Sequence, residues 1–145
     1  MTDVDGTSPD PGDLEVGDEG PTVVVEDISR RDVVKYAGAS GDFNPIHYDE
    51  PLTKRAGNPQ VFAQGMLTMG FASRLVARWF GLAGVERFRT RFQSRVFPGD
   101  SLTVTGEVTS VSADGAHVEA DVEVTNQDGV TVGTGDVTAD LSVRE

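Results

Sequence analysis

The residues best suited to catalysis lie in one short segment. Asp42 stands five residues before His47, the first of only two histidines in the chain, and the Asn44-Pro45 pair between them favours a turn. A carboxylate and an imidazole that hold one water molecule can move protons in both directions near neutral pH, because histidine titrates there. Asp42 and His47 are therefore the candidate catalytic pair.

A third candidate lies downstream, where a long apolar stretch begins at Gly65. The first amide groups of a helix have no partner inside the helix, so a glycine at that position can offer its N–H to a substrate oxygen. Such a donor stabilises negative charge on a carbonyl oxygen. A base, an acid and an oxyanion donor are thus all present in the sequence.

Each of these residues also has a purely structural interpretation. Asp42 could cap the turn that Asn44 and Pro45 form, as aspartate often does. His47 could be a core histidine bonded to a backbone carbonyl, and Gly65 could serve only close packing. The sequence alone leaves both interpretations open.

Length and composition limit the class of protein. A chain of 145 residues with 37% apolar residues suits one domain with a single core. The absence of cysteine excludes disulfides and thiolate chemistry, and neither histidine has metal-ligand spacing with a second one, so we expect no metal. Without an apolar run of about 18 residues or a signal-like N-terminus, we expect a cytoplasmic protein that does not enter membranes.

The net charge of −12 argues against nucleic acid as a partner, because phosphate binding needs a cationic surface. An anionic substrate would need a local exception. Arginine fills ten of the twelve basic positions, an acidic surface that resembles those of proteins from salt-loving organisms, although an ordinary acidic protein is the alternative. Four arginines could bind phosphate or form a solvated strand face, and these are Arg87, Arg89, Arg91 and Arg95.

Composition and periodicity predict the elements that position these residues. Residues 1–21 combine Asp, Glu, Gly and Pro and are predicted to be a disordered acidic tail, so that a single domain spans 22–145. Residues 22–25 form a short strand. A helix begins after Ser29 and ends near Gly41, a helical turn begins at Pro45, and residues 51–56 form a short helix.

The longest predicted helix runs from Gly65 to about Phe80 and is apolar around most of its circumference, so other elements must cover it. Residues 87–96, 102–111, 118–124 and 130–141 alternate as strands, with turns at Asp114-Gly115 and Asp128-Gly129. The predicted fold class is therefore α+β, with a long central helix wrapped by a curved antiparallel sheet.

Three segments resemble one known family. Asp42-Phe43-Asn44-Pro45-Ile46-His47, Gly65-Met66-Leu67 and the Phe97-Pro98-Gly99-Asp100 turn are similar to the MaoC-like hydratases and dehydratases, specifically the (R)-specific enoyl-CoA hydratases. The similarity covers about Val23 to Leu141. One departure is Gln64, where the family often has histidine, although the backbone donor of Gly65 survives that change.

The resemblance implies a hot-dog fold that forms a homodimer. It also implies a substrate carried as a thioester of coenzyme A or acyl carrier protein, with no cofactor. Asp42, His47 and Gly65 would then be catalytic, and the implied substrate-binding residues are Asn44, which supports the turn, Met66 and Ser73.

The implied reaction is the reversible addition of water to a trans-2-enoyl thioester, catalysed by a hydro-lyase. Two alternatives stay open. A hot-dog thioesterase would direct water at the carbonyl carbon instead, and a non-catalytic acyl-binding subunit of a two-chain dehydratase would need no catalytic pair. Acyl chain length, carrier and pathway also stay open at this point.

Overall fold

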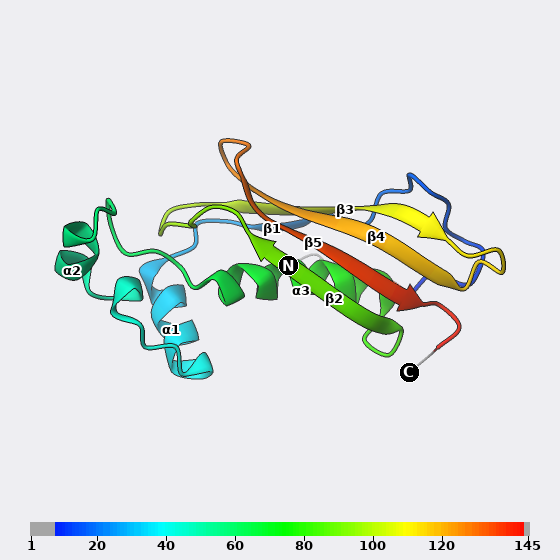
Figure 1. Ribbon diagram of the computed structural model, residues 1–145, viewed down its shortest axis with the longest axis horizontal. Helices are drawn as coiled ribbons and strands as arrows, with labels where there is room; N and C mark the ends of the chain where they lie inside the picture. The colour runs from blue at the N-terminus through cyan, green and yellow to red at the C-terminus, as the bar shows by residue number, and fades with distance from the viewer. Residues whose placement is uncertain (1–7, 144–145) are drawn as a thin grey trace.

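The computed structural model describes residues 8–143 and contains one curved sheet with a long helix against one face (Figure 1). Two shorter helices lie beyond one end of the sheet. In chain order the elements are β1 (Val23–Val25), α1 (Arg30–Ser40), the 3-10 turn η1 (Pro45–His47), α2 (Glu50–Arg55), α3 (Gly65–Phe80), β2 (Val85–Phe92), β3 (Leu102–Val111), β4 (His117–Asn126) and β5 (Thr131–Asp140).

The sheet is antiparallel throughout, in the order β1-β3-β4-β5-β2. Two tight hairpins connect β3 to β4 and β4 to β5, at the predicted turns. Gly115 and Gly129 occupy the left-handed region there, with φ of 71° and 75°, which glycine adopts without a Cβ clash. β1 and β2 both precede this meander in the chain, and they pair with its two outer strands, β1 with β3 and β2 with β5.

The core lies between α3 and the inner face of the sheet. Alternate residues of β4 are buried, as the period of a strand with one wet face requires, and these are Val118, Ala120, Val122 and Val124. Leu75 and Val76 of α3 pack into the same cluster. The predicted α+β class and the hot-dog arrangement, a helix wrapped by a curved sheet, are confirmed.

Local signals place α1 where the sequence predicted it. The Ser29 hydroxyl accepts the Asp32 N–H, and the Asp32 carboxylate accepts the Ser29 N–H, so that two free amides at the helix start are satisfied. Gly41 ends the helix with a φ of 75°. The chain therefore turns sharply just before Asp42.

The described part of the predicted acidic tail differs from the expectation of disorder. Gly17 N–H donates to the carbonyl of Val108 (2.8 Å), Val108 N–H donates to that of Asp18 (2.9 Å), and Gly20 N–H donates to that of Gly106 (2.9 Å). Because β1 pairs only with residues 102–104 of β3, the segment supplies partners for the rest of that strand. Residues 1–7 of the predicted tail lie outside the described residues.

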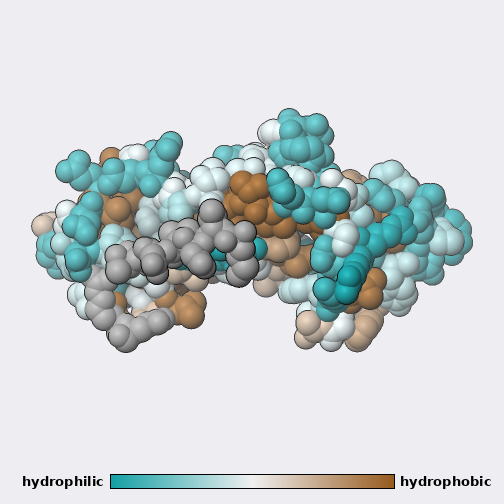
Figure 2. All heavy atoms as spheres, turned by 180° about the vertical axis from the view of Figure 1, so that it is seen from behind, coloured by the Kyte–Doolittle hydropathy of each residue, from teal (hydrophilic) through white to brown (hydrophobic). Residues whose placement is uncertain are grey.

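The surface is mainly hydrophilic, with apolar atoms gathered near the middle of the face shown in Figure 2. Exposed large apolar side chains include Phe43, Met66 and Phe92, all of which belong to the segments around the predicted site. Within residues 8–143, no helix has the length and hydropathy needed to span a membrane.

Candidate active site

The turn that carries the predicted pair is built by its own side chains. Asp42 Oδ1 accepts the Asn44 N–H (3.3 Å), and Asn44 Oδ1 accepts the Ile46 N–H (3.3 Å). Pro45 then begins η1, where its missing N–H costs nothing. Oδ1 of Asp42 thus caps the turn, as the structural interpretation of the sequence allowed, and Oδ2 remains available for other contacts.

That second oxygen faces the imidazole of His47. Asp42 Oδ2 lies 3.4 Å from His47 Nε2, and the side chains are 44% and 6% exposed, respectively. His47 Nδ1 lies 2.6 Å from the carbonyl oxygen of Phe62. A carbonyl only accepts, so Nδ1 carries a proton, and Nε2 is the ring nitrogen that faces Asp42.

Gly65 is the first residue of α3. Within residues 8–143, no hydrogen bond uses the N–H of Gly65 or Met66, whereas the amides of Leu67 and Thr68 donate to the Gln64 carbonyl (3.1 and 3.4 Å). The predicted free donor is therefore present at the helix start. Gly65 also has a packing reason, because a Cβ there would lie 2.9 Å from the ring of Phe92.

The buried side chain of Gln64 ties the start of α3 to α1. Its side chain is buried, and Nε2 donates to the carbonyl of Val33 in α1 (3.0 Å). Its Oε1 has no hydrogen-bond partner among the described residues. The glutamine at this position therefore links α1 to α3 and presents no side chain to solvent.

A cavity of about 370 Å³ opens beside Gly65, between the start of α3 and the end of β2. Its walls are mixed, with apolar and polar side chains from Phe62, Ala63, Gly65, Thr68, Phe92, Gln93, Ser94, Arg95, Val96 and Val132. Phe62 connects it to the pair, since its ring packs edge-on against the His47 ring with centroids 5.7 Å apart. Gly65 lines the cavity, Asp42 and His47 do not, and Phe62 is the contact between the imidazole and the cavity wall.

The implied substrate-binding residues differ in their surroundings. Asn44 holds the turn through its side chain, and Met66 is exposed beside Gly65. Ser73 lies two turns further along α3, where it is exposed and its hydroxyl donates to the carbonyl of Gly70 (2.7 Å). No contact joins Ser73 to Asp42 or His47 within the described residues, so its role stays a prediction.

The four arginines singled out in the sequence differ in their ion pairs. Arg87 and Arg89 contact Asp136 at 3.9 and 3.2 Å on the outer face of the sheet. Arg91 and Arg95 form no ion pair with any described residue. A larger hollow of about 690 Å³ on that outer face includes Arg89 and Arg91 but none of the predicted catalytic residues.

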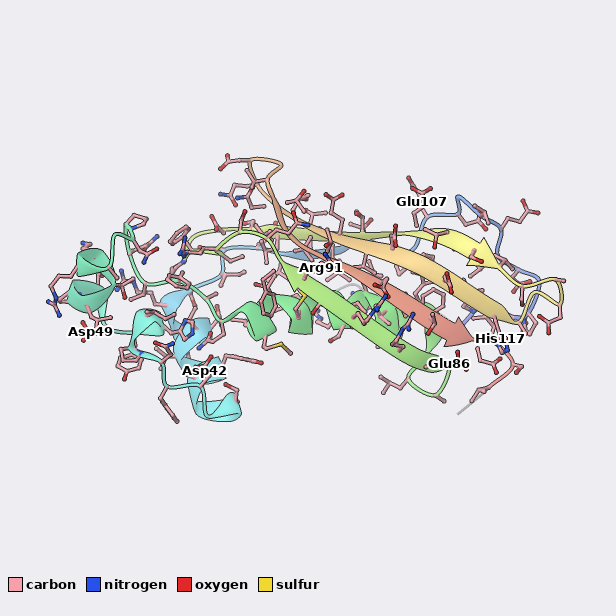
Figure 3. The ribbon with its side chains drawn as sticks, in the orientation of Figure 1. Asp42, Asp49, Glu86, Arg91, Glu107 and His117 are labelled. Carbon is pink, nitrogen blue, oxygen red and sulfur yellow. The ribbon has the colours of Figure 1, made fainter. Side chains whose placement is uncertain are left out.

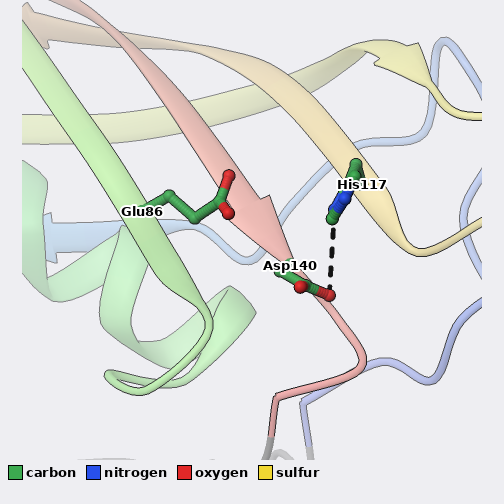
Figure 4. Close-up of side chains that lie close together, drawn as sticks. All are labelled: Glu86, His117 and Asp140. Carbon is green, nitrogen blue, oxygen red and sulfur yellow. Dashed lines mark ion pairs between the residues drawn. The ribbon is translucent and has the colours of Figure 1, made fainter.

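The second histidine, His117, lies in a cluster of polar side chains at the end of the sheet far from Asp42 (Figures 3 and 4). Glu86, His117 and Asp140, from β2, β4 and β5, bring potential ligand atoms within 4.8 Å of one another. Their types suit a divalent metal. Chain spacing could not reveal this group, because cross-strand pairing and a bulge at Glu86 assemble it.

Hydrogen bonds hold Asp140 within this group. The O–H and N–H of Ser142 donate to Asp140 Oδ1 at 2.6 and 2.9 Å, and these bonds lower the pKa of the Asp140 carboxyl. His117 Nδ1 lies 3.8 Å from the same oxygen. The carboxylate is thus stabilised in its charged form by its own turn.

Comparison with known proteins places these features in one family. The model of the MaoC like domain matches residues 15–132. Among relatives, the peroxisomal enoyl-CoA hydratase 2 of Arabidopsis thaliana is 32% identical over 85 residues, which are 57% of this chain and 28% of that protein. The 3-hydroxyacyl-thioester dehydratase Y of Mycobacterium tuberculosis is 35% identical over 97 residues, 64% of this chain and 33% of that protein.

Solved structures share the fold over most of the chain. The (R)-hydratase from A. caviae involved in PHA biosynthesis has a TM-score of 0.79 and 26% identity over 90% of this chain and 98% of that one. A MaoC-like dehydratase has a TM-score of 0.84 and 32% identity over 92% of this chain and 42% of that one. The curated relatives are longer, and the chain spans about a third or less of these two. The chain belongs to the MaoC-like domain family.

Proposed function

We propose that this protein catalyses the reversible addition of water to trans-2-enoyl thioesters. The observation that carries the proposal is the Asp42–His47 pair, whose buried imidazole packs against Phe62 in the wall of the cavity that Gly65 also lines. Relatives named as an enoyl-CoA hydratase and a 3-hydroxyacyl-thioester dehydratase support the same reaction class.

The main chemical task is to stabilise charge on the thioester carbonyl. When an oxygen nucleophile reaches Cβ of the enoyl group, electron density moves to the carbonyl oxygen. The N–H of Gly65 donates a hydrogen bond to that oxygen and stabilises its charge. The positive end of the α3 dipole adds to this stabilisation. Removal of one such donor costs roughly 2.7–4 kcal/mol in known oxyanion holes.

Asp42 and His47 handle the protons of the water. The Phe62 carbonyl keeps a ring proton on Nδ1, so that Nε2 and Asp42 Oδ2 together orient one water molecule. The pair accepts a proton from the water as its oxygen bonds to Cβ and the double bond opens, and the pair then returns a proton to Cα, so that one water is added and the pair is regenerated.

The proposal includes a homodimer and a thioester substrate of coenzyme A or acyl carrier protein. The outer edge of β2 has no strand beside it among the described residues, and an unprotected edge strand favours pairing with another chain. The exposed Phe92 at the end of this strand adds apolar surface to the same edge.

Crotonyl-CoA tests the reaction directly. We expect the purified protein to remove the enoyl absorbance without releasing free thiol. Thiol release at the same rate as any change in the enoyl group would indicate a thioesterase instead. If neither signal changes while the acyl thioester binds, the protein is a non-catalytic acyl-binding subunit and the proposal is wrong.

A further inference from the structure

A thioester substrate with a phosphate-bearing carrier is anionic, whereas the protein carries a net charge of −12. Long-range repulsion therefore opposes binding, and the site needs a cation of its own. The cavity beside Gly65 has one cationic side chain in its wall, Arg95. This arginine forms no ion pair with any described residue, despite the excess of carboxylates.

Arg95 belongs to a loop that is fixed on both sides. The amides of Gln93 and Ser94 donate to the carbonyl of Val132 at 3.0 and 3.2 Å, and the carbonyl of Val96 accepts the N–H of Ala63 at 2.8 Å. Val96 is also buried. The loop therefore holds Arg95 between the end of β2 and the segment that precedes α3.

The ring of Phe62 orients the guanidinium. Arg95 Cζ lies 5.2 Å from the centroid of this ring, within the range of a cation–π contact. Such a contact attracts the positive charge to the ring and needs none of the guanidinium N–H groups, which stay available to an oxyanion. The same ring packs edge-on against His47, so Phe62 joins the cation to the candidate catalytic pair.

We propose that Arg95 is the anion-binding residue of this site, which recognises a negatively charged oxygen group of the thioester substrate. The group is either the phosphate of the carrier arm or a carboxylate on the acyl chain, and both offer the paired oxygens that a guanidinium binds. The inference rests on the proposed function, because it names a determinant of substrate choice at the same cavity.

Three thioesters separate the two sources of charge. Crotonyl-CoA carries phosphate, the crotonyl thioester of N-acetylcysteamine carries neither group, and its fumaryl counterpart carries only a carboxylate. We expect Arg95→Gln to raise KM about tenfold for the thioester whose anion Arg95 binds, which is the usual effect of one charged hydrogen bond. The value of kcat and the KM of the neutral thioester should stay within about twofold.

Arg87→Gln is the matched control, because it removes the same charge from β2 but lies on the outer face beside Asp136. It should leave all three KM values unchanged. An Arg95→Gln variant that behaves like this control would overturn the inference, as would an equal rise in KM for the neutral thioester.

Binding without turnover keeps the inference separate from the reaction. Calorimetry should show that wild type binds coenzyme A more tightly than pantetheine, or the fumaryl thioester more tightly than the crotonyl one, and that Arg95→Gln abolishes the difference. If wild type hydrates none of the thioesters, the proposed function fails while this binding difference still supports Arg95. If the difference is absent in wild type or persists in the variant, the inference is wrong.

Discussion

The two histidines of this chain each lie near an aspartate, but at opposite ends of the molecule and in different surroundings. His47 is 6% exposed and lies 3.4 Å from Asp42, whereas His117 is 59% exposed and lies 3.8 Å from Asp140. The first imidazole is anchored through Nδ1 by a backbone carbonyl. The side chain of the second has Asp140 as its one ion-pair partner among the described residues.

A histidine beside an aspartate therefore does not make a catalytic site by itself. Burial and the bond to Phe62 hold the His47 ring in one orientation, and a free helix amide and a cavity lie in the same region. The Asp140 carboxylate instead accepts from Ser142 at the end of a strand. We therefore expect the first pair to act in catalysis and the second to affect only stability.

The test with the largest expected effect makes the same substitutions in both His–Asp pairs. Asp42→Asn and His47→Ala should each lower crotonyl-CoA hydration at least about 10²-fold, the low end of general acid–base catalysis. Asp140→Asn and His117→Ala should leave the rate within about twofold. Steady-state kinetics with circular dichroism as a folding control measures both, and equal losses at the two ends would remove the distinction.

Gly65→Ala should have the next largest effect. The added Cβ would lie 2.9 Å from the Phe92 ring, so either the ring or the start of α3 must move. Displacement of a positioned donor by a fraction of an ångström to 1 Å can cost up to about 10²-fold, and we expect a loss of kcat of at least tenfold. An unchanged kcat would show that the amide is not part of the site.

Gly70→Ala is the matched control on the same helix. No atom lies within 4 Å of its added Cβ, and the position is exposed. Alanine in a helix interior is favoured over glycine by about 1 kcal/mol, so this variant should unfold at a higher temperature with an unchanged rate.

Ser142→Ala should reduce stability at neutral pH without reducing the rate. The Ser142 bonds lower the pKa of Asp140 below its ordinary value of 3.8, so their contribution is complete above that value and is lost as pH falls through the folded pKa. The difference in unfolding free energy between wild type and Ser142→Ala should therefore shrink in acid. Urea titrations at pH 7 and pH 3 would contradict this if the difference grew instead.

Ser73→Ala should have the smallest effect. Its hydroxyl already donates to the carbonyl of Gly70, and such a mid-helix bond contributes little to stability. We expect a change of less than threefold in kcat/KM. A larger loss with normal folding would show that Ser73 reaches the substrate, as the family resemblance implies.

Strong periodicity made most of the fold predictable. The bounds of α3 match the prediction from Gly65 to Phe80, because a helix that is apolar on most sides has to be buried. The hairpin turns at Gly115 and Gly129 were also predicted, since glycine provides the positive φ that they need. These features depend on local sequence and on the need to cover one helix.

Predictions failed where distant backbone groups decide the structure. The strand predicted over 87–96 ends at Phe92, because Gln93 and Ser94 both donate to the single carbonyl of Val132 and the ladder stops. Residues 17–20 pair with residues 106–108 of β3 despite their acidic composition. The acidic composition of this segment indicates that it is well solvated. It cannot show that the edge of β3 lacks a hydrogen-bonding partner elsewhere in the chain.

The candidate site was predictable in part for the same reason. Asp42 and His47 are brought together by one local turn, which their spacing indicated. The anchor at Phe62 and the cation at Arg95 come from segments that meet only in the folded chain. The exposed group of Glu86, His117 and Asp140 was missed entirely, since it requires the register of three strands.

The central claim is that Asp42 and His47 act as one unit, and a double-mutant cycle on crotonyl-CoA hydration tests it most directly. Residues that share one catalytic function lose most of it when either is removed. We predict that Asp42→Asn combined with His47→Ala is no more than about threefold slower than the slower single variant. Losses that multiply, or near wild-type rates in all three variants, would contradict the account.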